Sequence, residues 1–149
     1  MPFVELFAPR GALDGERGTR AKQRLVAEVM AVEGAPDTQA ARDISWLVVT
    51  EPAEWFVGGR AAGADEPPRY LVRVSVPAGS LDDGKRREMV ERVTRVLAEA
   101  EEDAGRLYAA PVAWVHLVEI PDGNWGAMGR VFRLPDIIEF TTGAPAGAG

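Results

Sequence analysis

The first two residues of the chain carry the most unusual candidate chemistry in it. If Met1 is removed, Pro2 becomes a free secondary amine at the start of an alternating apolar stretch that runs to Ala8. A solvated α-amino group titrates at roughly 7.7 to 8.0, and an apolar pocket or a nearby cation lowers that value because each disfavours the charged form. Pro2 is therefore a candidate proton-transfer group near neutral pH. A proline behind methionine is also compatible with efficient methionine removal, and alone it indicates only processing.

Composition removes several other kinds of chemistry. The 149 residues are 46% hydrophobic, which is typical of one globular domain with a substantial core. The chain has no cysteine, so disulfides and thiolate nucleophiles are excluded, and a single histidine, His116, excludes a multi-histidine metal site. We expect no metal and no cofactor. The net charge of −6 includes no long block of either sign, which disfavours nucleic-acid binding but permits a basic site for a small anion.

The chain shows no targeting or membrane segment. Its start lacks a basic region followed by a long apolar run, and no apolar stretch approaches the roughly 18 residues that span a bilayer. A cytoplasmic, soluble protein without membrane contact is the expectation.

The first part of the chain has the pattern strand, helix, strand. Pro2 to Ala8 alternates like a strand, Pro9-Arg10-Gly11 predicts a turn, and a helix begins near Asp14. Gly34-Ala35-Pro36 ends this helix. The nearly continuous apolar run from Ile44 to Thr50 predicts a second strand, covered on both faces or lying at a subunit contact. The inner face of the helix is predicted to carry Ala21, Leu25, Val29 and Val32.

A break in the pattern separates this part from the next. Glu51 to Gly59 predicts a loop containing aromatic residues, and Arg60 to Pro68 is a connector rich in Gly, Ala, Pro and acidic residues.

The pattern then starts again. Arg69 to Val76 is predicted to be a strand, Ser80 and Asp83 offer a capping pair for a second helix, and Gly105 ends it. Val112 to Glu119 is the fourth predicted strand. The buried face of the second helix is predicted to hold Met89, Val93, Val96, Leu97 and Ala100.

The two parts align when the sequence is moved over itself by 68 positions without a gap. The matches fall at the turn, the helix start, the helix middle and the second strand, which indicates an internal duplication. The matched pairs are Pro9 with Pro77, Gly11 with Gly79, Leu13 with Leu81, Asp14 with Asp82, Arg24 with Arg92, Trp46 with Trp114 and Glu51 with Glu119.

These elements predict an α+β fold of two tandem βαβ units. Right-handed crossovers give parallel strands in each unit and one four-stranded sheet with two helices on one face. The other sheet face is then uncovered and apolar, which predicts oligomerisation, with a homotrimer of six βαβ units as one solution. The predicted divisions are 2–59 for the first unit, 60–68 for the linker, 69–130 for the second unit and 131–149 for a C-terminal arm and flexible tail.

Several segments together carry a family resemblance. They are Pro2 with the strand to Ala8, Leu47 to Glu51 with Phe56 to Gly59, and Trp114 to Pro121 with Trp125-Gly126 and Gly129-Arg130. On these residues the chain resembles the tautomerase superfamily, which has the tautomerase/MIF-like fold and uses an amino-terminal proline as catalyst. Its duplicated length resembles a fused 4-oxalocrotonate tautomerase, and its build is similar to the cis-3-chloroacrylic acid dehalogenase group.

The resemblance implies a role for Pro2. As a neutral amine it would abstract a proton next to a carbonyl, and as a protonated amine it would deliver one to an alkene carbon. The implied reaction is keto–enol isomerisation of a small 2-keto or enol acid, whose carboxylate calls for an arginine. The alternatives are a related lyase, either a decarboxylase or a hydratase or dehalogenase, and a non-catalytic trimeric scaffold.

The chain departs from the family patterns at most of the arginine positions. The tautomerase pattern has an arginine on the second strand, where this chain has Trp46. It has another arginine after the first turn, near Ala12 of this chain, where Arg10 is a neighbour. The two arginines of the dehalogenase pattern fall on Pro77 and Ser80.

Its catalytic groups depart as well. In the dehalogenase pattern, the water-activating glutamate aligns with Ala127 of this chain, and the active-site tyrosine aligns with His116. The histidine in the first helix of that pattern has no counterpart here. Dehalogenation by the family's hydrolytic route is therefore not expected. Arg130 matches an arginine retained in the dehalogenase group.

The resemblance and the residues together give a candidate site, with Pro2 and His116 as catalytic residues. Each member also has a structural interpretation. His116 is either a buried structural histidine or a hydrogen-bond donor in the site. Arg73 points either to a pocket or to solvent, and Arg130 either holds an anion or pairs with surface acids. Trp125, like Trp55, is either a pocket wall or a packing residue. The candidate substrate-binding residues are Arg73, Arg130, Trp125 and Arg10.

Two further expectations concern the second unit and the tail. Tyr70 occupies the position equivalent to Pro2 and has no free amine, so only the first unit can use such a base. Ile137-Ile138 and Phe140 are expected to form a short strand or arm that packs on a neighbouring subunit. Thr141 to Gly149 is rich in Ala, Gly and Pro, which is typical of disorder.

Overall fold

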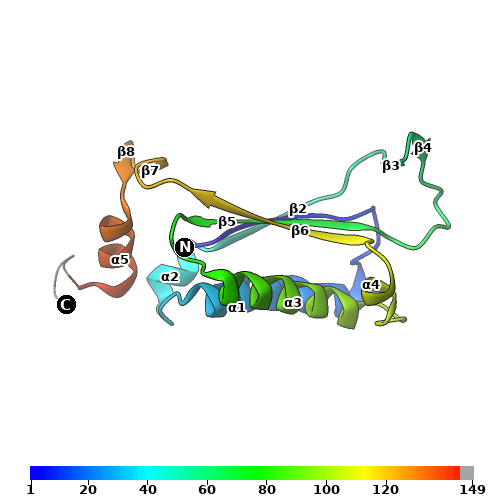
Figure 1. Ribbon diagram of the computed structural model, residues 1–149, viewed down its shortest axis with the longest axis horizontal. Helices are drawn as coiled ribbons and strands as arrows, with labels where there is room; N and C mark the ends of the chain where they lie inside the picture. Colours follow the sequence, from blue (N-terminus) through cyan, green and yellow to red (C-terminus); the bar gives the residue numbers. More distant parts are fainter. Residues whose placement is uncertain (145–149) are drawn as a thin grey trace.

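The protein is described from a computed structural model that places residues 1–144 (Figure 1). One sheet and two long helices make up the body, with short hairpins and helices at the two ends of the sheet. The elements in chain order are β1 (Phe3–Phe7), α1 (Gly15–Glu33), α2 (Gln39–Asp43), β2 (Trp46–Thr50), β3 (Phe56–Val57), β4 (Arg60–Ala61), β5 (Tyr70–Pro77), α3 (Asp83–Ala100), α4 (Arg106–Ala109), β6 (Ala113–Ile120), β7 (Trp125–Ala127), β8 (Arg130–Phe132) and α5 (Leu134–Thr142).

The main sheet has four strands in the order β2-β1-β5-β6. β1 is parallel to β2, β5 is parallel to β6, and the two central strands β1 and β5 are antiparallel. Helices α1 and α3 lie side by side under one face of the sheet (Figure 1). The predicted pair of βαβ units in one four-stranded sheet is therefore confirmed.

The core lies between the sheet and these two helices. Alternation along β1 sends Val4 and Leu6 to the helices, where both are buried. All four residues predicted for the inner face of α1 are buried, and of the five predicted for α3 only Ala100 is partly exposed. The hydrophobic periodicity of the sequence therefore located the core correctly.

The start and end of α3 differ from the prediction. Its N-cap is Asp82, whose side chain accepts a hydrogen bond from the Lys85 amide at 2.8 Å. The prediction of Ser80 with Asp83 was wrong because the cap must directly precede the first helical residue. The helix ends at Ala100, and Gly105 instead precedes the short helix α4.

Strand β2 is shorter and more exposed than predicted. It begins at Trp46, because the chain first forms α2 and a turn at Ile44. β2 lies at an edge of the sheet, and four of its five residues are exposed. The prediction that this strand is covered on both faces is therefore wrong for the isolated chain. The alternative, that it lies at a subunit contact, stays a prediction.

The loops and the C-terminal segment are more ordered than predicted. β3 and β4 form a hairpin within the predicted loop and connector, and β7 and β8 form another at the opposite end of the sheet (Figure 1). The predicted short strand or arm is helix α5, which packs on α2 of the same chain, with the Thr38 hydroxyl donating to the Thr141 carbonyl at 2.6 Å. Of the segment predicted to be disordered, Thr141 and Thr142 are helical, and residues 145–149 lie outside the described range.

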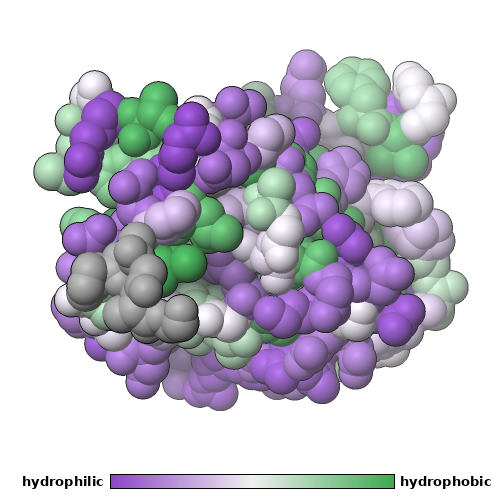
Figure 2. Space-filling model, turned by 60° about the vertical axis from the view of Figure 1, so that its left-hand side comes forward, coloured by the Kyte–Doolittle hydropathy of each residue, from purple (hydrophilic) through white to green (hydrophobic). Residues whose placement is uncertain are grey.

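The sheet face opposite the helices is largely apolar. Register places two tryptophans on it, Trp46 on β2 and Trp114 on β6, with exposed fractions of 62% and 60%. A polar row crosses its middle, formed by Glu5, Arg73 and His116 on adjacent strands. In Figure 2 the lower surface, where α1 and α3 lie, is mainly hydrophilic, whereas hydrophobic patches interrupt the upper surface.

Ion pairs on the solvent side join the two long helices. Arg92 on α3 donates to Glu28 on α1 at 2.8 Å, and this hydrogen bond lowers the pKa of Glu28 from its ordinary value of 4.5. Because the folded-state pKa is the lower one, this stabilisation is complete above about pH 4.5 and is lost as the pH falls through the folded value. We expect Glu28→Gln to cost about 1 kcal/mol or less at pH 7 and nothing at pH 2. Urea denaturation at both pH values measures this, and an equal cost at both would contradict it.

Among residues 1–144, no helix is both long and apolar enough to cross a membrane.

Candidate active site

The amino terminus is held inside the molecule at one end of the sheet. The Met1 ammonium lies 2.5 Å from Glu33 Oε1, and the side chain of Glu33 is only 6% exposed. Pro2 is buried, and its carbonyl accepts a hydrogen bond from the Trp46 amide of β2. The first strand therefore delivers the start of the chain to a buried carboxylate.

The end of α1 fixes the position of this carboxylate. Glu33 is the last residue of α1, and Gly34 ends the helix in the left-handed region at φ 85°, which glycine adopts without strain. Lys85 donates its ammonium to the main-chain oxygen of Glu33 at 3.3 Å, a favourable place for a cation at a helix C-terminus. The side chain of Glu33 is thereby left to face the amino terminus.

The second unit repeats this arrangement with a different cation. The 68-residue shift places Glu33 on Glu101, which follows the last residue of α3. Glu101 accepts hydrogen bonds from the Tyr70 hydroxyl at 2.9 Å and from Arg106 at 2.5 and 2.7 Å. Burial, and then the bond to Glu101, raises the pKa of Tyr70. In each unit a glutamate from the end of the long helix thus lies beside the beginning of the first strand. In the first unit, the cation that this glutamate binds is the chain's own amino terminus.

An apolar cavity of about 150 Å³ adjoins the amino terminus. Met1 forms part of its wall, so loss of this residue would enlarge it next to Pro2. The other lining residues come from the α2–β2 turn, the β7–β8 hairpin and α5, and they are Ile44, Trp125, Gly126, Ala127, Met128, Phe132, Ile137 and Phe140.

Two buried polar atoms near the amino terminus have no hydrogen-bond partner. They are Glu33 Oε2 and Trp125 Nε1, and no other side-chain nitrogen or oxygen in residues 1–144 is buried in this way. An unsatisfied buried polar group costs about 1–3 kcal/mol, so such groups need an explanation. One belongs to the carboxylate that binds the Met1 ammonium and the other to a residue in the cavity wall.

Of the three candidate arginines, Arg130 lies nearest to this cavity. Its guanidinium carbon is 4.9 Å from the centre of the Phe132 ring, and Phe132 lines the cavity. Arg130 is exposed and forms no ion pair with the described residues, so its charge is available to an anion. Trp125, in the cavity wall, and Arg130, beside Phe132 of that wall, are thus the two candidate binding residues that the structure places at the cavity lined by Met1.

Arg73 and His116 lie together but away from the amino terminus. They are register neighbours on β5 and β6, in the middle of the helix-free face. Arg73 is 3.9 Å from Glu5 and about half exposed. His116 is exposed, so the alternative of a buried structural histidine was wrong. Within one chain this pair does not reach the cavity at Pro2.

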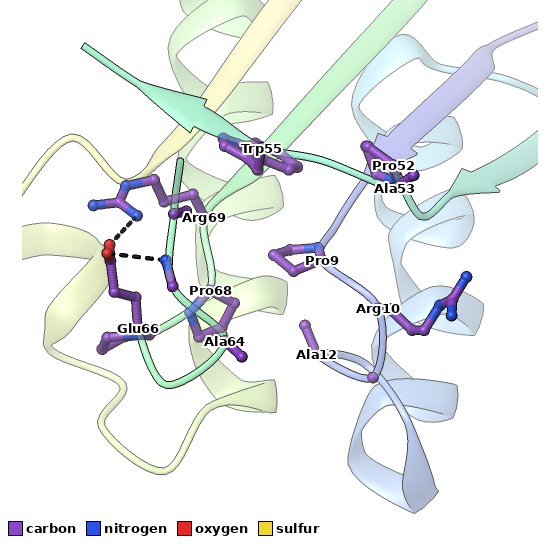
Figure 3. A pocket seen from close by; sticks show the side chains of 14 residues that line it. Pro9, Arg10, Ala12, Pro52, Ala53, Trp55, Ala64, Glu66, Pro68 and Arg69 are labelled. Carbon is purple, nitrogen blue, oxygen red and sulfur yellow. Dashed lines mark hydrogen bonds and ion pairs between the residues drawn. The ribbon is translucent and has the colours of Figure 1, made fainter. Parts of the chain in front are cut away.

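Arg10 lies at the opposite end of the sheet. It follows β1, and the five residue-to-residue steps from Pro2 to Phe7 span roughly 17 Å of strand. There it lines a larger cavity of about 520 Å³ that also contains Trp55. Figure 3 shows that Arg10 points away from Pro9 and Pro68.

Apart from Arg10, the charged side chains in the wall of this larger cavity are already paired with protein groups. Glu66 accepts hydrogen bonds from the Gly63 amide and from Arg69 (Figure 3), and also from Arg60. These bonds lower its pKa to about 2, and the one from Arg60 has the largest effect. All the charges of that network are paired with one another, which leaves Arg10 as the free cation among the residues that line the cavity.

Sequence reasoning missed the group nearest to the amino terminus, Glu33. A signal was present, because the same 68-residue shift that pairs the tryptophans also pairs Glu33 with Glu101. It also missed Phe132, which connects Arg130 to the cavity, because no pair of strands was predicted where the β7–β8 hairpin forms.

Comparisons with known proteins identify the fold. No protein-family model matches the sequence, and no curated protein matches it. Solved structures do match: a member of the cis-3-chloroacrylic acid dehalogenase family called N1 (18% identity, 97% of this chain and 85% of that chain, TM-score 0.64), Pt0534 inactivated by 2-oxo-3-pentynoate (17%, 87% and 95%, 0.64), and the R7 fused 4-OT asymmetric trimer (19%, 87% and 94%, 0.64). The predicted α+β fold and the structural resemblance to the tautomerase superfamily are confirmed.

Proposed function

We propose that this chain, which has the tautomerase-superfamily fold, is a proline-dependent tautomerase that interconverts the enol and keto forms of a small 2-keto acid. After loss of Met1, the secondary amine of Pro2 transfers the proton. The observation that carries the proposal is the position of the two unpaired buried polar atoms, Glu33 Oε2 and Trp125 Nε1. One lies on the carboxylate that binds the amino terminus, and the other on a wall of the adjoining apolar cavity.

Each neighbouring group has a role in this proposal. The apolar walls of the cavity receive the hydrocarbon part of the substrate. The buried N–H of Trp125 donates to the substrate's enol or carbonyl oxygen, and Arg130 binds the carboxylate. Proton transfer by a positioned group contributes typically 10² to 10⁴ in rate, and it requires that Pro2 exchange its proton near the working pH.

The assembly belongs to the same proposal. The structurally similar R7 fused 4-OT is a trimer, and the helix-free face of this chain is apolar and exposes two tryptophans. We propose a homotrimer packed through this face. Arg73 and His116 line neither the cavity beside Met1 nor the one beside Arg10, so in such an assembly they act at a cavity only across a subunit boundary. Arg10, at the opposite end of the sheet, likewise reaches a Pro2 site only across that boundary.

The experiment starts from the intact mass of the purified protein, which shows whether Met1 is absent. The Met1-free protein is then assayed with phenylenolpyruvate, whose ketonisation is followed by absorbance, and with malonate semialdehyde. We expect turnover of the enol acid and no release of carbon dioxide. Decarboxylation without tautomerisation would replace the proposal by the lyase alternative.

A labelling experiment addresses the amine directly. Pt0534 is inactivated by 2-oxo-3-pentynoate, an electrophilic ynone that adds to neutral amines. We expect one equivalent to attach to this chain and peptide mapping to locate it on Pro2. Labelling only at lysines would contradict a reactive proline.

We expect Trp125→Phe to raise the KM for phenylenolpyruvate by about 3- to 10-fold, the equivalent of one net hydrogen bond. Phenylalanine keeps the apolar wall and removes only the N–H group. The matched control is Trp55→Phe at the other end of the sheet, which should leave KM unchanged. Equal effects of the two substitutions would exclude Trp125 as the donor.

One observation favours a second candidate, a non-catalytic scaffold. With Met1 present, its ammonium forms the buried ion pair with Glu33 and its side chain forms part of the cavity wall. Retention of Met1 in the native protein would block the proline amine, and the intact mass therefore decides between the two candidates.

A further inference from the structure

We propose that Glu33 is a positioning residue that holds the amine of processed Pro2 in its protonated form, so that Pro2 begins the reaction as a proton donor. This inference rests on the proposed function and assigns the direction of its first step. The substrate class it selects is an enol acid, whose electron-rich carbon accepts a proton, in preference to a keto acid that must first lose one.

The distances place the carboxylate within reach of the amine. Glu33 Oε1 lies 2.5 Å from the Met1 nitrogen. Three bonds of about 1.46, 1.52 and 1.33 Å join this nitrogen to that of Pro2, so the Pro2 nitrogen is within about 7 Å of the carboxylate oxygen. When Met1 is removed, the positive charge moves to Pro2, and a rotation of the Glu33 side chain brings its oxygens to the new ammonium.

Burial gives this contact its strength. The side chain of Glu33 is 6% exposed, and its Oε2 has no partner. A buried carboxylate without a cation is costly, and an opposite charge at about 4–6 Å favours the charged form of an amine. The ammonium of processed Pro2 carries two N–H donors, enough to satisfy both oxygens of Glu33.

The internal repeat supports the assignment independently. At the equivalent place in the second unit, Glu101 also has a nearly buried side chain, and there it binds the guanidinium of Arg106. The fold therefore places a glutamate with a cationic partner at the end of each long helix. In the first unit no arginine fills that role, and among the described residues the amino terminus is the only partner of the Glu33 side chain.

The other charges at this end do not replace Glu33. Lys85 and Arg130 are cations, and both favour the neutral amine. Asp43 on α2 and Glu139 on α5 are exposed carboxylates, whose fields are screened by water. Glu33 is thus the buried group that favours the charged amine.

The proton transfer is balanced. An N–H bond of the Pro2 ammonium breaks and a C–H bond forms on the enol carbon, using the electron pair of the carbon–carbon double bond. The hydroxyl of the enol loses its proton to water as its oxygen becomes the carbonyl. Neutral Pro2 then recovers a proton from water, so that the net reaction is an isomerisation.

The test measures the titration of Pro2 directly. In uniformly ¹⁵N-labelled, Met1-free protein, the ¹⁵N shift of Pro2 is followed against pH for the wild type, Glu33→Gln and Glu33→Asp. We expect Glu33→Gln to lower the midpoint by about one pH unit or more, and Glu33→Asp to restore most of that shift. The matched control is Glu28→Gln on the same helix, whose ion pairs join α1 to α3, and it should leave the midpoint unchanged.

The pH profile of turnover gives a second readout. Because the protonated amine is the active form for enol acids, activity is present below the midpoint and is lost above it. Glu33→Gln should therefore move the alkaline loss of activity to lower pH. An unchanged or raised midpoint in Glu33→Gln would overturn the inference even if the enzyme is active. A lowered midpoint in a protein without tautomerase activity would uphold the contact and reject the proposed function instead.

Discussion

Replacing Pro2 by alanine lowers kcat/KM for the ketonisation of phenylenolpyruvate by about 10²- to 10⁴-fold, the range that positioned proton transfer contributes. Alanine is also compatible with loss of Met1 and leaves a primary amine at the same strand end. That amine is free to rotate, whereas the proline ring fixes the nitrogen and its two donors relative to Glu33. The substitution therefore changes the proton donor and leaves the rest of the cavity in place.

The control for this experiment is Pro111→Ala. Pro111 is exposed before β6, at the end of the sheet opposite the amino terminus, and its substitution should leave kcat/KM within about twofold of the wild type. Intact mass must show that Met1 is absent from all three proteins, and circular dichroism that they are folded. Turnover by Pro2→Ala at the wild-type rate would remove Pro2 as the proton-transfer group.

The sequence predicted the elements that place Pro2 but not the carboxylate that binds the amino terminus. Alternation along Pro2 to Ala8 and the 68-residue repeat are local patterns, and both follow directly from strand pleating and helical periodicity. The contact between residues 1 and 33 joins the start of a strand to the end of the following helix. The end of the helix at Gly34 was predicted from the sequence. The contact also depends on how α1 packs back along β1, which is a three-dimensional arrangement that periodicity does not give.

The candidate arginines show a second limit of sequence reasoning. Arg73 was a candidate because it interrupts an apolar strand, but its direction is set by pairing with Glu5 across the antiparallel strands β1 and β5. A shift of one residue in that register would have sent it toward the helices. Arg130 was a candidate from resemblance alone, and its place beside the cavity comes from the β7–β8 hairpin, a pair of three-residue strands in a glycine-rich segment.

The helix-free face provides the link between fold and assembly. The two tryptophans matched by the repeat, Trp46 and Trp114, lie on the two edge strands of the sheet, at positions related by the duplication. A duplicated chain therefore presents two similar edges, which suits a closed ring of chains better than an open pair. The row of Glu5, Arg73 and His116 between them supplies charges of both signs, which fix the orientation of a neighbour more than they add affinity.

Substitution of Trp114 by glutamate should convert the proposed trimer to a monomer at micromolar concentration. An aromatic side chain buries roughly 150–250 Å², and at roughly 25 cal/mol per Å² the exposed 60% of Trp114 corresponds to about 2–4 kcal/mol per subunit. Glutamate removes this favourable free energy of burial and adds a charge that is costly to bury. Sedimentation equilibrium should give three times 16.1 kDa for the wild type and 16.1 kDa for the variant.

Tyr108→Glu is the matched control, because Tyr108 on α4 is 61% exposed and lies off the helix-free face. It should remain trimeric, which separates loss of the interface from a general effect of an added charge. Since Trp114 is exposed in the isolated chain, its replacement leaves the core intact, and the monomer should unfold cooperatively. A trimeric Trp114→Glu variant would show that another surface joins the subunits. A wild type that sediments as a monomer would leave Arg73 and His116 without a cavity to act on and Arg10 at the cavity of the opposite end of the sheet. The site would then consist of Pro2, Glu33, Trp125 and Arg130 alone.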